Sequence, residues 1–143
     1  MRNHDIAVYR EIQKNTEMAI KAIDTLTDKV YDDQFSLQMQ RQSSKYSEIK
    51  QRACERMLQE NVEPYRTNQI SNMMLVGGIH YNTLLNNSTG HIAELMIKGS
   101  NMGILEMNKV LNHNLDAGEL PVSLAKELIA FENKNIERLT KYL

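Results

Sequence analysis

A carboxylate interrupts the apolar pattern near the end of the chain. Glu132 lies in the segment 121–143, at a position where apolar residues spaced three and four apart call for a hydrophobic side chain. A buried carboxylate costs several kcal/mol unless it is paired or neutralised. The sequence therefore predicts a partner for Glu132. The candidates are Gln42, a basic side chain, a metal ion or the hydroxyl of Tyr9, Tyr46 or Tyr81.

Other polar residues also interrupt apolar seams. Glu106 lies at the edge of the broad apolar face of the segment 89–113, and Thr16 and Gln42 occupy seam positions in two earlier segments. Together they predict a polar layer inside a helical protein, whose hydrogen bonds would fix the register of the helices. The alternative is a metal site in which Glu132 and Glu106, with His80, bind iron or manganese.

Motifs typical of several enzyme classes are missing from the sequence. Carboxylate-bridged di-iron bundles use Glu-x-x-His on two of their helices, but no Glu here has a His three residues later. The chain also has no phosphate-binding loop, no dinucleotide-binding glycine pattern and no nucleophile elbow. We therefore expect a protein without a cofactor and without catalysis, and assign no catalytic residue.

The elements that must position these residues are helices. Five segments carry apolar residues at helical spacing, and no segment has the alternation of a strand. The sequence predicts a single all-α domain over 1–143, an up-down four-helix bundle with one additional helix. Whether the third and fourth segments form one kinked helix or two is left open. The five segments are 5–30, 32–61, 68–86, 89–113 and 121–143.

Methionines and glycines gather in the third and fourth segments. We expect Met96, Met102 and Met107 to lie in the core. Gly99 and Gly103 share one helical face, where they would let a neighbouring helix approach closely. The alternative is a small-ligand pocket between helices, opened by these glycines and by Gly77 and Gly78. The face of the third segment expected to point to the core comprises Ile70, Met73, Met74, Gly77, Tyr81, Leu84 and Leu85.

Composition limits the partners and the compartment. The 17 basic and 18 acidic residues give a net charge of −1, which argues against a nucleic-acid-binding protein. The single cysteine, Cys54, excludes an internal disulfide framework. We expect no export signal, because the N-terminal stretch lacks the apolar run of about 7–15 residues that such a signal contains. We expect no membrane span, because no run reaches the ~18 apolar residues required. A cytoplasmic homodimer, or a complex with a protein partner, is predicted, with the apolar excess of 68–86 and 89–113 as its surface.

Three stretches resemble a known group of proteins. They are EIQKNTEMAIKAIDTL at 11–26, STGHIAELMIKGSNMGILEMNKVLN at 88–112 and LAKELIAFENKNIERLTKYL at 124–143. They are similar to an uncharacterised family of small ferritin-like helical proteins from anaerobic Firmicutes, akin to spore-coat and rubrerythrin-type bundles. The resemblance implies a ferritin-like up-down bundle without an assigned activity. We expect such a bundle to act through self-association or a protein partner, in stress or sporulation. The Glu-x-x-His ligands of functional ferritins and rubrerythrins are missing, so the resemblance assigns no metal ligand.

Overall fold

The chain folds into five α-helices. The computed structural model describes residues 1–66 and 69–143, and within these ranges it contains no strand. The all-α prediction is confirmed, and the helix ends agree with the predicted segments within a few residues. The predicted start at 68 lies outside the described residues. The helices are α1 (Asn3–Thr27), α2 (Asp33–Gln59), α3 (Gln69–Leu85), α4 (Thr89–His113) and α5 (Glu119–Thr140).

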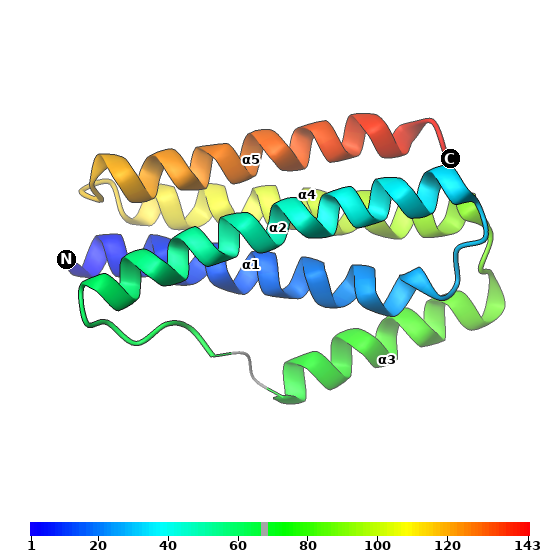
Figure 1. The fold of residues 1–143 in the computed structure, drawn as a ribbon, viewed down its shortest axis with the longest axis horizontal. Helices are drawn as coiled ribbons and strands as arrows, with labels where there is room; N and C mark the ends of the chain where they lie inside the picture. The colour runs from blue at the N-terminus through cyan, green and yellow to red at the C-terminus, as the bar shows by residue number, and fades with distance from the viewer. Residues whose placement is uncertain (67–68) are drawn as a thin grey trace.

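Four of the helices lie side by side as two antiparallel pairs. Figure 1 shows α1 beside α2 and α4 beside α5, and these two pairs make the most extensive contacts in the molecule. The pairs meet where α1 contacts α4 and where α2 contacts α5. The helix α3 lies outside this group and packs mainly against α1. The third and fourth predicted segments are therefore two helices, separated by the short link 86–88.

Local hydrogen bonds explain where the helices begin and end. The Asp32 carboxylate caps α2 by accepting from the Phe35 amide at 2.8 Å. At its other end, Asn61 adopts a left-handed conformation (φ 56°), and the next amide donates to the Met57 carbonyl at 2.9 Å. The Ser88 hydroxyl caps α4 by accepting from the His91 amide at 3.3 Å.

Side chains of α1 hold the connection that follows α2. The Gln13 side chain is buried and accepts from the Tyr65 amide at 2.7 Å, while its nitrogen donates to the Cys54 sulfur at 3.2 Å. Arg10 donates to the Glu63 carbonyl at 3.2 Å. The chain is thereby kept along α1 before α3 begins.

The core is apolar and lies between the two helix pairs. The expected seams of α1, α2 and α5 are largely buried, and the Phe35 and Tyr142 rings pack together with centroids 4.7 Å apart and planes tilted by 31°. Met96 and Met107 lie in the core as predicted, but Met102 is 57% exposed, so that expectation is wrong. The largest fully buried apolar side chains are Tyr9, Phe35, Ile12, Leu26, Met39, Ile49, Met57, Ile92, Met107, Leu128 and Leu139.

The predicted core face of α3 is wrong. Met73, Met74, Tyr81 and Leu84 are 74%, 73%, 70% and 82% exposed, whereas Thr83 is buried. The side chains of Ile70 and Leu85 lie outside what the structure describes. The helix is apolar on more than one face, so its spacing alone does not select the face that docks. The face that turns inward carries Leu75, Ile79 and Thr83.

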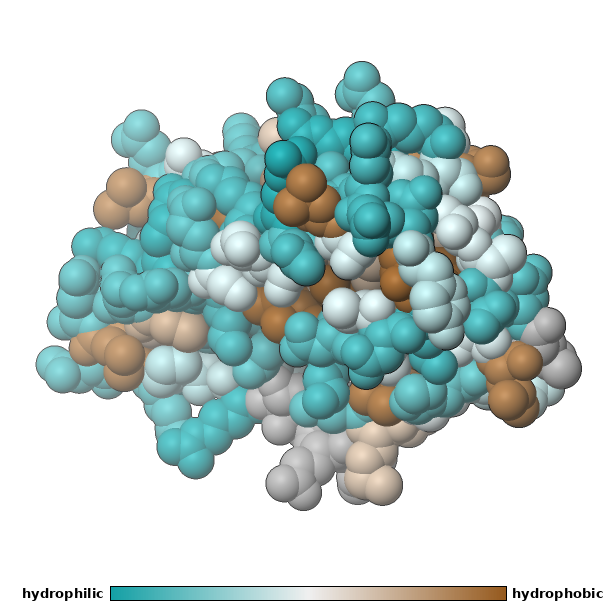
Figure 2. Space-filling view, turned by 45° about the vertical axis from the view of Figure 1, so that its right-hand side comes forward, coloured by the Kyte–Doolittle hydropathy of each residue, from teal (hydrophilic) through white to brown (hydrophobic). Residues whose placement is uncertain are grey.

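Exposed apolar side chains are not confined to α3. On the face in Figure 2 they form separate brown patches between hydrophilic side chains.

Among the described residues, none of the helices combines the length and the apolar character needed to cross a lipid bilayer.

Candidate functional site: a cavity with a buried carboxyl group

The Glu132 carboxyl group is buried in a small hydrogen-bond network. Its side chain projects from α5, and the residue is only 4% exposed. The hydroxyls of Tyr46 on α2 and Ser100 on α4 hydrogen-bond to it. The Tyr46 oxygen also accepts from the Asn135 side-chain nitrogen at 3.1 Å. Of the partners suggested by the sequence, Tyr46 is therefore confirmed, and three helices meet at this carboxyl group.

Burial determines how Glu132 ionises. Loss of contact with water raises the pKa of the Glu132 carboxyl group to about 7, although hydrogen bonds from Tyr46 and Ser100 partly oppose this shift. Burial and the nearby Glu132 charge raise the pKa of Tyr46 well above its usual value, so this phenol remains a donor. No cation pairs with Glu132 among the described residues. This carboxyl group therefore gains and loses its proton near neutral pH, well above the range of an exposed glutamate.

A cavity of about 530 Å³ opens beside this network. Its size lies within the ~300–1,000 Å³ typical of small-molecule sites. Every helix contributes to its wall, with α1 and α4 forming the largest part. The lining residues are Glu11, Lys14, Asn15, Met18, Ala19, Ala22, Ile23, Leu26, Gln42, Tyr46, Leu75, Ile79, Leu95, Met96, Gly99, Ser100, Met102, Gly103, Glu106, Leu128 and Glu132.

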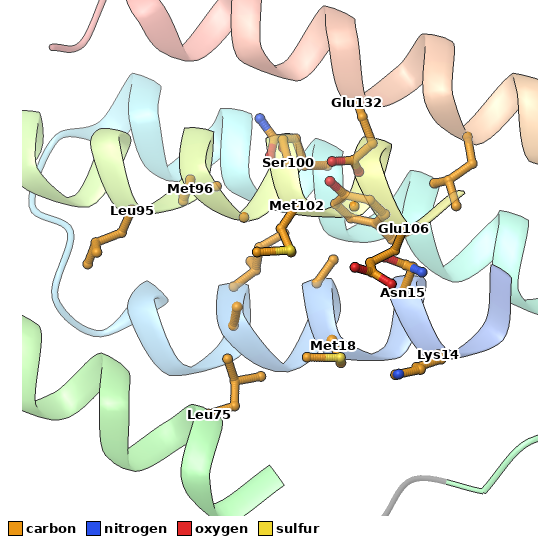
Figure 3. A pocket seen from close by; sticks show the side chains of 18 of the residues that line it. Lys14, Asn15, Met18, Leu75, Leu95, Met96, Ser100, Met102, Glu106 and Glu132 are labelled. Atoms are coloured by element: carbon orange, nitrogen blue, oxygen red, sulfur yellow. The ribbon is translucent and has the colours of Figure 1, made fainter. Parts of the chain in front are cut away.

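The cavity has a polar end and an apolar end. In Figure 3, Glu132, Glu106 and Asn15 come together at one end, whereas Leu75 and Leu95 lie toward the other. The Asn15 nitrogen donates to the Glu11 carboxylate at 2.9 Å. Its oxygen is turned toward Gly103. Oxygen acceptors from α1, α4 and α5 therefore face one end of an otherwise apolar space.

The glycines of α3 and α4 do not mark places where two helix backbones meet. A Cβ atom on Gly99, Gly77 or Gly78 would meet none of the described residues within 4 Å. A Cβ atom on Gly103 would meet only side chains, with Asn15 Oδ1 and Glu132 Oε2 each 3.5 Å away. The expectation of close helix approach at Gly99 and Gly103 is therefore wrong. Both residues line the cavity, which favours the alternative of a pocket between helices.

Only two of the three proposed metal ligands come together. Glu132 and Glu106 line the same cavity, but His80 is exposed on α3 and does not line it. The half-buried Glu106 carboxylate pairs with Lys109 at 3.3 Å. Within the described ranges, no group of three or more His, Cys, Asp or Glu residues could hold a metal ion.

The predicted polar layer forms in part. Gln42 is 2% exposed and lines the cavity, where its side-chain nitrogen has no hydrogen-bond partner among the described residues. Thr16 is also buried, but it donates to the Ile12 carbonyl of its own helix at 2.8 Å and so links no other helix. The Gln42 nitrogen is therefore a buried donor that does not link its helix to another described one.

Sequence reasoning missed Ser100, Asn135 and Asn15. Asn135 lies three residues after Glu132, which is the spacing of neighbours on one helix face. Ser100 lies three residues before Gly103 on the apolar face of α4. These spacings could have predicted that Asn135 and Ser100 lie near the site. Asn15 carried no such signal, because its position depends on how α1 packs against α4.

Comparison with protein-family models, with curated proteins and with solved structures gives no match to this chain.

Proposed function

We propose that this chain is a ferritin-like up-down helical bundle that acts without catalysis, by associating with a second copy of itself or with another protein. The observation that carries this proposal is the uncovered apolar stripe of α3, formed by Met73, Met74, Tyr81 and Leu84, all at least 70% exposed. Helices that are apolar on all sides are normally buried. Since α3 packs mainly on α1, a second surface would cover the outer side.

The geometry of the α3 stripe suits a second copy. Tyr81 lies seven residues after Met74, and Leu84 lies eleven residues after Met73 and three after Tyr81, so these side chains share one side of the helix. Gly77 lies near the centre of the stripe, and nothing occupies the space beside it. Two such stripes related by a two-fold axis would form a self-complementary interface, with their backbones closest at the glycines.

Sedimentation equilibrium over a range of concentrations tests the association. The wild-type chain is expected to dimerise, and the double variant Met73→Gln, Leu84→Gln to dissociate at least ~100-fold more readily, because four apolar side chains per dimer lose their burial. Leu58→Gln is the matched control, since Leu58 is 61% exposed on α2, outside the stripe. A chain that stays monomeric, and retains no protein partner in a pull-down, contradicts the proposal.

The proposal also includes a biological process, a cellular compartment and a bundle topology. The resemblance to ferritin-like proteins of anaerobic Firmicutes suggests a role in stress or sporulation. A cytoplasmic location is supported by the free thiol of Cys54. The alternating directions of neighbouring helices support the up-down bundle.

A second candidate function is metal binding or redox chemistry at Glu132 and Glu106. The supporting observation is that both carboxylates, from adjacent helices, line one cavity. Elemental analysis after exposure to Fe²⁺ and Mn²⁺ tests it, with Glu132→Leu as the variant. Stoichiometric metal that this variant loses would favour the metal site. A metal-free wild type, with a Glu132→Leu variant at least as stable, would reject it.

A further inference from the structure

The cavity between the helices has the composition of a binding site for an amphipathic molecule. Its wall is mostly apolar, and a buried carboxyl group, a buried amide and a buried hydroxyl come together within it. Small-molecule sites combine these two features, an apolar wall and a few placed polar groups. The cavity lies on the inner side of α3, opposite the stripe proposed for association.

The polar end favours a ligand that donates hydrogen bonds and carries positive charge. Three carboxylates, those of Glu11, Glu106 and Glu132, line the cavity against one cation, Lys14. Glu106 also pairs with Lys109, and Glu11 accepts from Asn15, so both of these carboxylates have partners. Glu132 is the most buried of the three, and among the described residues its partners are hydroxyl groups. A cation at Glu132 would supply a counter-charge that the described part of the chain does not place there.

A buried amide, that of Gln42, also contributes to the cavity wall. Gln42 lies on α2, one helical turn before Tyr46. The cavity wall therefore combines this amide with the carboxyl group of Glu132 and the hydroxyl of Ser100.

We propose that this cavity binds a small amphipathic amine, with its apolar body between α1, α3 and α4 and its ammonium group at Glu132 and Asn15. The apolar end offers Leu75, Leu95 and Met96 to the body of the ligand. Gly99 leaves room along α4, because a Cβ atom there would meet none of the described residues within 4 Å. The carboxyl group and the Asn15 oxygen then accept from the ammonium group.

Isothermal titration calorimetry with three octyl compounds tests this proposal. Octylamine, octanol and octanoate share one apolar body and differ in the head group. Octylamine is expected to bind, octanol to bind more weakly, and octanoate to bind least. Glu132→Gln should weaken octylamine binding about 10-fold to 100-fold and leave octanol unchanged, because it removes the charge and keeps the side-chain size.

Two further variants make the result specific. Glu137→Gln, an exposed glutamate on the same helix, is the matched control and should leave octylamine binding unchanged. Gly99→Leu fills the empty space beside α4, so it should weaken all three compounds while circular dichroism reports the wild-type helix content. Octylamine binding that Glu132→Gln leaves unchanged, or octanoate binding of equal strength, overturns the amine assignment. No binding by any of the three overturns the cavity as a ligand site.

Discussion

At the scale of single residues, Glu132 makes the stability of the fold depend on pH. Its pKa is about 7 in the folded chain against a reference value of 4.5, because burial disfavours the charged form. Between these two values the folded state binds more protons than the unfolded state, so stability falls as pH rises. The loss amounts to about 3 kcal/mol and is complete above pH 7.

The variant Glu132→Gln should remove this dependence. Its free energy of unfolding, measured in urea, should exceed that of the wild type above pH 7 and approach it below pH 4.5. The amide keeps an oxygen that accepts from Tyr46 and Ser100, so the network loses its charge and keeps these bonds. Glu137→Gln should follow the wild-type profile. Parallel profiles for the wild type and Glu132→Gln would show that the carboxyl group is hydrated in solution.

At the scale of secondary-structure elements, the end of α2 depends on one backbone conformation. Asn61 has a left-handed φ of 56°, and the amide of Val62 bonds back to Met57. Only glycine and, less readily, asparagine adopt this conformation at low cost. Asn61→Gly should therefore keep or raise the free energy of unfolding, whereas Asn61→Val should lower it by about 1–2 kcal/mol. Thermal unfolding of both variants checks this, and equal melting temperatures would contradict it.

The sequence predicts elements better than it predicts which face of an element is buried. The helices α1 and α2 each carry a single apolar stripe. Only that face can be buried, so the sequence is enough to predict their core residues. The helix α3 offers apolar residues on both sides, and the docked face, with Ile79 and Thr83, was not the one expected. The prediction that Gly99 lies at a close helix contact is wrong for a related reason. A glycine in a helix is compatible both with a closely packed neighbour and with an empty space beside it.

The weak docking of α3 should be visible in its dynamics. Because α3 buries one face, mainly on α1, it has fewer apolar contacts to lose than a helix inside the bundle. Native-state hydrogen exchange should give its amides an opening free energy at least ~2 kcal/mol below that of α1. The amides near Ile12, which is fully buried, are the internal reference. Equal opening energies for the two helices would mean that α3 unfolds only with the whole molecule.

At the scale of the whole molecule, α3 connects the two proposed binding surfaces. Its inner side, with Leu75 and Ile79, closes the cavity, and its outer side carries Met73, Tyr81 and Leu84. A ligand in the cavity and a second copy on the stripe both require α3 to be docked. Each should therefore favour the state that the other binds, and linkage makes this effect reciprocal.

Saturating octylamine should accordingly tighten dimerisation, by about fivefold or more in the dissociation constant measured by sedimentation. Glu132→Gln should dimerise as the wild type does without the amine, and the same amine concentration should change its dissociation constant much less. The stripe variant Met73→Gln, Leu84→Gln should still bind octylamine, because its changes lie on the outer side of α3. If saturating octylamine leaves the dimer dissociation constant unchanged, α3 is docked in every state. The cavity and the stripe then act independently.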